Sequence, residues 1–167
     1  GTAELAMAVE NSDVRRIIYL SSLSVYGTHS EPINIDSGLK PRSFYAISKL
    51  KGEEQIERLS KSKEVFIIRS GNVYGFNPAI RLDAVVNRFM FEANFNGKIS
   101  IHGSGEQHRA FIHVDKLASI LSKICKSDMT ADVYNLAEFN FSINEILRVL
   151  QSLYPELEYI HVNQNIR

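Results

Sequence analysis

Two short apolar runs, each ending in small polar residues, constrain the fold of this chain more than any other feature. Residues 17–20 (IIYL) lead into Ser22, and residues 65–68 (VFII) lead into Gly71 and Asn72. A short, continuous apolar run between polar segments is typical of a parallel β-strand that is buried on both faces of its sheet. The sequence therefore predicts parallel strands whose carboxyl ends are polar.

Segments with a helical spacing of apolar residues separate these runs from further strand-like runs. The predicted helices cover residues 43–60, 82–94, 114–126 and 143–153, and the predicted strands cover residues 17–20, 65–68, 99–102, 133–136 and 159–162. Chains that alternate strands and helices in this way form parallel sheets with helices on both faces. We therefore expect an α/β fold with a doubly wound sheet.

Two similar tetrapeptides follow the first two predicted strands. They are residues 24–27 (SVYG) and residues 72–75 (NVYG). Because the carboxyl ends of parallel strands meet at one edge of a sheet, both tetrapeptides are expected near that edge. Open α/β sheets bind their ligands there.

The composition excludes several classes of protein. Nineteen basic residues balance nineteen acidic ones, so no net charge attracts a nucleic acid or an anionic membrane. No apolar run approaches the ~20 residues of a membrane span. The single cysteine, Cys125, cannot form an internal disulfide, which fits a reducing compartment. We expect a soluble, cytoplasmic protein, with Cys125 in the buried run of residues 117–126.

Tyr45 and Lys49 have a spacing that suits proton transfer. They are four residues apart on a predicted helix, so their side chains lie on one face and within reach of each other. A free tyrosine titrates near pH ~10, and a neighbouring positive charge favours the phenolate that a general base requires. The spacing alone is weak support, because such pairs also arise by chance and a surface tyrosine can stack on a lysine stem.

Ser22 strengthens the interpretation of this pair. It ends a predicted strand about 20 residues upstream, where its hydroxyl would project over the sheet edge. There the hydroxyl can bind a sugar hydroxyl or carbonyl group while the tyrosine exchanges its proton. The lysine can also bind the ribose of a nicotinamide cofactor. The three residues together predict a catalytic trio.

Longer motifs surround these residues and follow one another in order along the chain. They are residues 19–27 (YLSSLSVYG), 45–49 (YAISK), 69–75 (RSGNVYG), 103–115 (GSGEQHRAFIHVD) and 133–136 (VYNL). Several motifs in a fixed order are far more specific than any one of them. They resemble the motifs of the extended short-chain dehydrogenases, the NAD-dependent epimerase/dehydratase family, and the resemblance runs from the first residues to about Ser142.

This resemblance implies roles for seven residues. The implied catalytic residues are Ser22, Tyr45 and Lys49, the cofactor-binding residues are Tyr45, Lys49 and Gly71, and the substrate-binding residues are Ser22, Asn72, His102 and Arg109. The implied cofactor is NAD, with NADP still open, and the implied substrate is a nucleotide sugar. Arg109 would bind its phosphates, because the planar donor fork of a guanidinium group suits a phosphate.

Simpler explanations exist for some of these residues. Asn72 could cap the turn after its strand, and Arg109 could be a surface ion-pair residue, although the motif context favours the functional roles. The spacings of His102, His108 and His113 match no common zinc pattern. We therefore expect no metal site.

One part of the family's pattern does not occur in this sequence. The glycine-rich loop that holds the cofactor's pyrophosphate is expected roughly 100 residues before Ser22. The resemblance therefore implies the C-terminal part of a doubly wound, Rossmann-like parallel sheet plus part of a small substrate-binding subdomain. Residues 1–75 would carry the catalytic trio, and residues 76–167 would form the substrate-binding segment and the last strand and helix units. We expect an excised piece of a longer enzyme that is inactive alone.

The residues after Ser22 indicate which reaction of the family to expect. Sugar-nucleotide 4,6-dehydratases typically place an Asp-Glu pair there, whereas this chain has Leu23 and Ser24. The resemblance thus implies a 4-epimerase, in which Tyr45 removes and returns a hydroxyl proton around a keto intermediate. A keto-reductase or dehydratase of the same family is an alternative, and so is a non-catalytic binding module that has lost cofactor binding.

The resemblance also implies a possible homodimer. Its interface would involve the helix that carries Tyr45 and the neighbouring residues 2–11.

Overall fold

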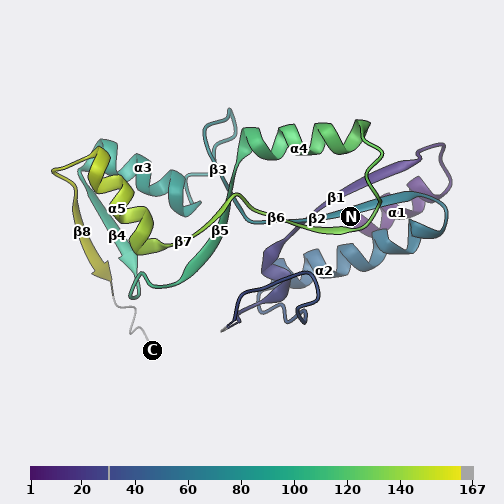
Figure 1. Cartoon of the computed structure of the whole chain (residues 1–167), viewed down its shortest axis with the longest axis horizontal. Coiled ribbons are helices and arrows are strands. Elements are labelled where there is room, and N and C mark those ends of the chain that lie inside the picture. Colours follow the sequence, from purple (N-terminus) through teal and green to yellow (C-terminus); the bar gives the residue numbers. More distant parts are fainter. Residues whose placement is uncertain (30, 163–167) are drawn as a thin grey trace. The chain divides into compact units, whose positions relative to one another are not determined.

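Helices are separated along the chain by single strands or by pairs of consecutive strands (Figure 1). The computed structural model describes residues 1–29 and 31–162. The α-helices are α1 (Thr2–Glu10), α2 (Phe44–Glu57), α3 (Val85–Asn96), α4 (Val114–Lys126) and α5 (Ile143–Leu153). The strands are β1 (Arg16–Ser22), β2 (Glu64–Ser70), β3 (Asn72–Tyr74), β4 (Lys98–His102), β5 (His108–His113), β6 (Val133–Leu136), β7 (Phe139–Ser142) and β8 (Glu158–Val162). Two 3-10 helices, η1 (Leu23–Tyr26) and η2 (Arg58–Lys61), follow β1 and α2.

The chain forms two compact units. The first unit contains Gly1–Gly71 and Ala118–Leu136. The second contains Asn72–Leu117 and the residues from Ala137 onward. The assignment of functions to residues 1–75 and 76–167 stays a prediction.

The first unit is a three-layer α/β structure. Its sheet has the strand order β1-β2-β6, and both pairings are parallel. Figure 1 shows α2 and α4 on opposite faces of this sheet. Val65 and Ile67 of β2 pack on the side of α1 and α2, and Phe66 and Ile68 pack with Ile124 of α4 on the other side. The prediction of a doubly wound parallel sheet is therefore confirmed.

The two strands that were predicted first differ in burial. In the central strand β2, every residue from Val65 to Ser70 is buried. In β1 most residues are only half-buried, and Leu20 is exposed. The prediction of burial on both faces therefore holds for β2 but not for β1, which has β2 as its one neighbouring strand among the described residues.

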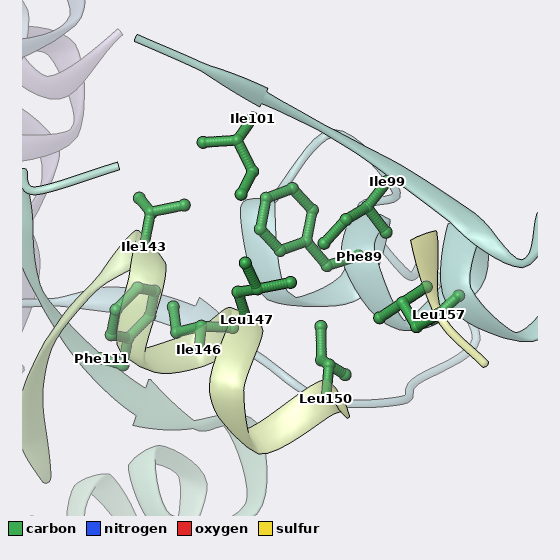
Figure 2. Packing of buried hydrophobic residues seen from close by; sticks show 10 residues of the cluster. Phe89, Ile99, Ile101, Phe111, Ile143, Ile146, Leu147, Leu150 and Leu157 are labelled. Carbon is green, nitrogen blue, oxygen red and sulfur yellow. The ribbon is translucent and has the colours of Figure 1, made fainter. Parts of the chain in front are cut away.

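The second unit contains strands that the apolar pattern did not predict. In one sheet β3 pairs with β5 in parallel and β5 pairs with β7 in antiparallel orientation. A separate parallel pair joins β4 and β8. Helices α3 and α5 contribute to the core of this unit, in which apolar side chains gather around Phe89 (Figure 2). The tetrapeptide at residues 72–75 thus lies in and after β3, whereas the tetrapeptide at residues 24–27 lies in and after η1 of the first unit.

Helix α4 buries one face and exposes Cys125. Ile120, Leu121 and Ile124 pack into the core of the first unit, which is the spacing of a single helical stripe. Cys125 lies one residue beyond this stripe and is exposed. Its predicted burial is therefore wrong. In the described part of the chain, no helix is long and apolar enough to cross a membrane.

Gly52 allows α2 to approach β1 closely. It is buried in α2, and a Cβ added there would overlap the hydroxyl group of Tyr19 on β1. The close approach also brings the Tyr19 hydroxyl to 3.5 Å from the carbonyl oxygen of Lys49, to which it donates. The packing of α2 on β1 therefore requires a residue without a side chain at position 52.

We expect Gly52→Ala to lower the free energy of unfolding by about 1–2 kcal/mol. Overpacking typically costs about 1–3 kcal/mol, and the higher helix propensity of alanine offsets up to about 1 kcal/mol of it. Gly38→Ala is the matched control, because no atom lies within 4 Å of a Cβ added there. Urea unfolding of both variants gives the comparison. Equal stability of the two variants would show that Tyr19 moves aside freely.

Candidate active site

Three consecutive residues of β1 hold α2 by hydrogen bonds. The Tyr19 hydroxyl donates to the Lys49 carbonyl oxygen, and the Lys49 ammonium donates to the Leu20 carbonyl oxygen at 2.9 Å. The Ser21 hydroxyl donates to the carboxylate of Glu53. These contacts end at the residue before Ser22, so α2 is attached to the carboxyl end of β1.

Ser22 ends β1 and caps η1. Its Oγ accepts hydrogen bonds from the backbone N–H of Ser24 at 3.2 Å and from the Ser24 hydroxyl at 2.9 Å. A serine hydroxyl has two acceptor sites and one hydrogen to donate. Because Ser24 occupies both acceptor sites, the hydrogen of Ser22 is left to donate to another group.

The Lys49 ammonium lies over two tyrosine rings. Its nitrogen is 5.8 Å from the ring centroid of Tyr45 and 5.5 Å from that of Tyr19. Tyr45 lies in the first turn of α2 and is 57% exposed. The Tyr45 ring is thus accessible to a ligand, and a cation lies within the range of a cation–π contact.

Tyr19 stays protonated at neutral pH. Burial raises the pKa of its hydroxyl above 10.0, and the nearby Glu53 and Tyr45 raise it further, although a hydrogen bond with Thr2 acts in the opposite direction. Tyr19 can therefore act as a donor to Lys49 but cannot supply a phenolate near pH 7.

Gly71 lies at the same edge of the first sheet as Ser22. In the register of β1 and β2, Ser22 is opposite Ser70, and Gly71 is the next residue. The Gly71 N–H donates to the carbonyl oxygen of Leu136 at 2.9 Å. The structure thus groups Ser22, Tyr45, Lys49 and Gly71 in the first unit.

The remaining predicted site residues belong to the second unit. Asn72 is exposed on β3, and its side-chain amide donates to the Ala110 carbonyl oxygen at 3.0 Å, so it bridges two strands and does not cap a turn. His102 ends β4, and Arg109 lies on β5 opposite Phe141; both are exposed.

The three central histidines do not gather. His108 lies 3.7 Å from Glu145, and His113 lies 3.6 Å from Asp115. No group of histidine, cysteine, aspartate and glutamate side chains among residues 1–29 and 31–162 could hold a metal ion.

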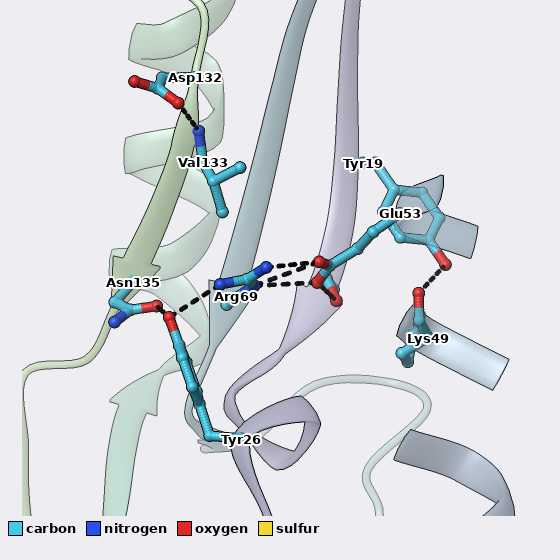
Figure 3. Close-up of polar contacts among 9 residues, drawn as sticks. Tyr19, Tyr26, Lys49, Glu53, Arg69, Asp132, Val133 and Asn135 are labelled. Atoms are coloured by element: carbon cyan, nitrogen blue, oxygen red, sulfur yellow. Dashed lines mark hydrogen bonds and ion pairs between the residues drawn. The ribbon is translucent and has the colours of Figure 1, made fainter. Parts of the chain in front are cut away.

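A polar network around the buried Arg69, which the sequence pattern did not predict, joins α2, β2, η1 and β6 (Figure 3). Glu53 of α2 and Arg69 of β2 form an ion pair with hydrogen bonds of 2.7, 3.1 and 3.2 Å. Arg69 also donates to the Tyr26 hydroxyl at 2.9 Å, and that hydroxyl donates to the side chain of Asn135 at 2.8 Å. One signal was present in the sequence, because Arg69 is a charged residue directly after the apolar run of a buried strand.

The charge of Arg69 is stabilised by its partners. Burial acts to lower the pKa of the guanidinium, but the hydrogen bonds to Glu53 and Tyr26 and the charge of Glu53 outweigh it and raise the pKa. Arg69 is 7% exposed and Glu53 is 3% exposed. Arg69 therefore remains charged inside the protein over the neutral pH range.

The site contains groups that suit one end of a dinucleotide cofactor. The Lys49 ammonium has three donors and uses one on Leu20, so it can serve a ribose hydroxyl, and Tyr45 is exposed beside it. A pyrophosphate needs a different structure, a glycine-rich turn between a strand and a helix. Among the described residues, no strand-to-helix turn has that composition.

Comparison with known proteins gives the family of the chain. It matches the model of the NAD dependent epimerase/dehydratase family over residues 1–137 and belongs to that family. The family that the motifs predicted is thus confirmed.

The relatives include more than one kind of enzyme. A dTDP-D-glucose 4,6-dehydratase of Homo sapiens is 29% identical over 160 residues, which are 93% of this chain and 45% of that protein. A UDP-glucuronate 4-epimerase of Thermodesulfobacterium geofontis is also 29% identical, over 92% of this chain and 48% of that protein. The chain spans about half the length of these curated relatives.

Solved structures of similar fold cover nearly the whole chain. An NAD-dependent NDP-hexosamine 5,6-dehydratase involved in tunicamycin biosynthesis matches with a TM-score of 0.87 and 29% identity, over 97% of this chain and 54% of that chain. A UDP-glucuronic acid 4-epimerase from Bacillus cereus, in complex with UDP-glucuronic acid and NAD, matches with a TM-score of 0.86 over 97% of this chain and 53% of that chain. At 24% identity, the second match concerns the fold alone.

We expect Tyr26→Phe to lower the free energy of unfolding by about 1–3 kcal/mol, because it leaves a buried guanidinium nitrogen of Arg69 without its partner. Tyr134→Phe is the control: its hydroxyl bonds to Thr130 at an exposed position, and the change is expected to stay within about 0.5 kcal/mol. Thermal unfolding followed by circular dichroism measures both. If the Tyr26→Phe protein is as stable as the control, the Tyr26 hydroxyl does not stabilise the network around Arg69.

Proposed function

We propose that this chain carries the catalytic trio of an NAD-dependent sugar-nucleotide 4-epimerase. The observation that carries the proposal is the arrangement at the end of β1: Ser22 has a hydrogen to donate, and the Lys49 ammonium lies over the ring of the exposed Tyr45. Ser22 ends β1, and Tyr45 lies on α2, which is hydrogen-bonded to the same strand. A hydroxyl donor and an acid/base group on these two elements suit proton transfer at a sugar hydroxyl. The family, whose named relatives act on nucleotide sugars, supports this substrate class.

In the proposed mechanism Tyr45 takes the proton of a sugar hydroxyl, with the Lys49 ammonium 5.8 Å from the centroid of its ring. Ser22 donates its hydrogen to the same sugar oxygen and stabilises that oxygen as the hydroxyl becomes a carbonyl. NAD, when bound, supplies the acceptor for the carbon-bound hydride. Tyr45 would then return the proton to that oxygen once the sugar has turned over and its opposite face has been reduced, which inverts the carbon. Lys49 would also hold the cofactor's ribose, and Gly71 would be a further cofactor contact.

The residues after Ser22 favour epimerisation over dehydration. Elimination of water requires groups that remove and deliver protons, and the positions where dehydratases typically have carboxylates hold Leu23 and Ser24. Ser24 instead uses its hydroxyl to hold Ser22. Sequence identity does not separate the two reactions, because a dehydratase and an epimerase are both 29% identical to this chain.

On the substrate side, we propose that Asn72, His102 and Arg109 contact the nucleotide sugar. All three are exposed at the ends or the middle of strands in the second unit. The guanidinium group of Arg109 has the donor geometry for a diphosphate.

We also propose a homodimer through α1 and α2. Leu5 and Met7 of α1 and Phe44 and Ile47 of α2 are large apolar side chains exposed on these helices. Packing two copies of this surface together would remove them from water.

The experiment uses the full-length polypeptide that contains this sequence, with NAD and a panel of nucleotide sugars. We expect interconversion of two 4-epimers, and we expect Tyr45→Phe to lower kcat roughly 100-fold or more. Tyr134→Phe is the control, and its kcat should equal that of the wild type.

Chromatography of the sugars measures the interconversion, and the NADH absorbance reports whether the cofactor is reduced. A dehydrated keto sugar as product would identify a dehydratase. Full activity of Tyr45→Phe would refute the proposed acid/base group, and a wild type without turnover or NAD binding would support the non-catalytic module.

A further inference from the structure

Glu53 continues the row of α2 that carries the proposed acid/base group. Tyr45, Lys49 and Glu53 follow one another at intervals of four residues, so they lie along one side of the helix. Exposure decreases along this row, from 57% at Tyr45 to 3% at Glu53. The buried end of the row is therefore where α2 is attached to the sheet.

The Arg69 guanidinium connects two elements of the trio. Through Nε and Nη2 it binds Glu53 of α2, the helix that carries Tyr45 and Lys49. Through Nη1 it binds the Tyr26 hydroxyl of η1, the short helix that Ser22 caps. One rigid, planar group thus bridges the two elements (Figure 3).

Stability alone does not explain a buried ion pair at this place. The desolvation of two charges consumes much of their attraction, and apolar residues of similar volume are often as stabilising. An ion pair differs from an apolar contact in its direction, because both carboxylate oxygens and two guanidinium nitrogens must stay in register. The exposed pair of Lys51 and Glu54 on the same helix has no such constraint.

We infer that Glu53 and Arg69 are positioning residues for the Ser22, Tyr45 and Lys49 site. They fix α2 along β1 and fix η1 beside it, and so they set where Tyr45 and Lys49 stand relative to Ser22. The same register keeps the Lys49 ammonium on the Leu20 carbonyl oxygen. This inference rests on the proposed function, since positioning matters only if the trio acts on one substrate.

The kinetic test separates positioning from stability with two variants and a control in the full-length protein. Glu53→Gln leaves Arg69 charged without an opposite charge, so both the unfolding temperature and kcat should fall. Glu53→Met with Arg69→Met removes both charges, so the unfolding temperature should recover while kcat, per folded protein, stays about 10- to 100-fold below that of the wild type. The KM for the nucleotide sugar should change by less than about threefold, because the binding groups are retained.

Glu54→Gln is the matched control. Its neighbouring, exposed carboxylate also pairs with a lysine, and its loss should change neither kcat nor the unfolding temperature measurably. If the double variant regains wild-type kcat together with wild-type stability, Glu53 and Arg69 are structural only and the inference is wrong.

A crystal structure of the same double variant tests the inference without any activity. We expect α2 to be displaced along β1 by about 1 Å or more, with loss of the hydrogen bond from Lys49 to Leu20. An unchanged position of α2 would overturn the inference even if the enzyme proves inactive. A wild type without turnover would count against the proposed function instead, so the two failures are distinct.

Discussion

The buried guanidinium of Arg69 holds together most of what is specific to the first unit. It stands on the central strand β2 and reaches Glu53 on α2, Tyr26 on η1 and, through Tyr26, Asn135 on β6. A charge this deeply buried requires partners on several sides, because each unpaired donor would carry a desolvation penalty. Arg69 thus connects the parallel sheet to the helix that carries Tyr45 and Lys49. The proposed chemistry depends on these contacts of Arg69, since proton transfer requires fixed distances between Ser22 and α2.

Part of the fold followed directly from local sequence patterns. The run at residues 65–68 predicted a strand buried on both faces, and β2 is such a strand because helices cover both sides of it. Strands β3, β5 and β7 escaped prediction for a physical reason. They are short and contain many polar residues, and they are stabilised by pairing with segments far along the chain, as Asn72 pairs with Phe111.

The candidate site was predictable to a similar extent. Tyr45 and Lys49 could be found because their spacing on a helix has a chemical meaning, and Ser22 because it ends a strand. Glu53 could not be found in this way. A glutamate on a helix is usually exposed, and its burial here depends on Ser21 and Arg69, which come from two other strands. Cys125 shows the opposite case, in which an apolar-looking residue lies just outside the buried stripe.

In the proposed site one network places Ser22, Tyr45 and Lys49 around a single reacting sugar oxygen. A crystal structure of the full-length protein with NAD and its nucleotide sugar measures this most directly. We expect Tyr45 Oη and Ser22 Oγ both to lie within about 2.6–3.2 Å of the same sugar oxygen. The ion pair of Glu53 and Arg69 should be intact in that structure. A sugar bound with its reacting oxygen beyond the reach of either hydroxyl would contradict it.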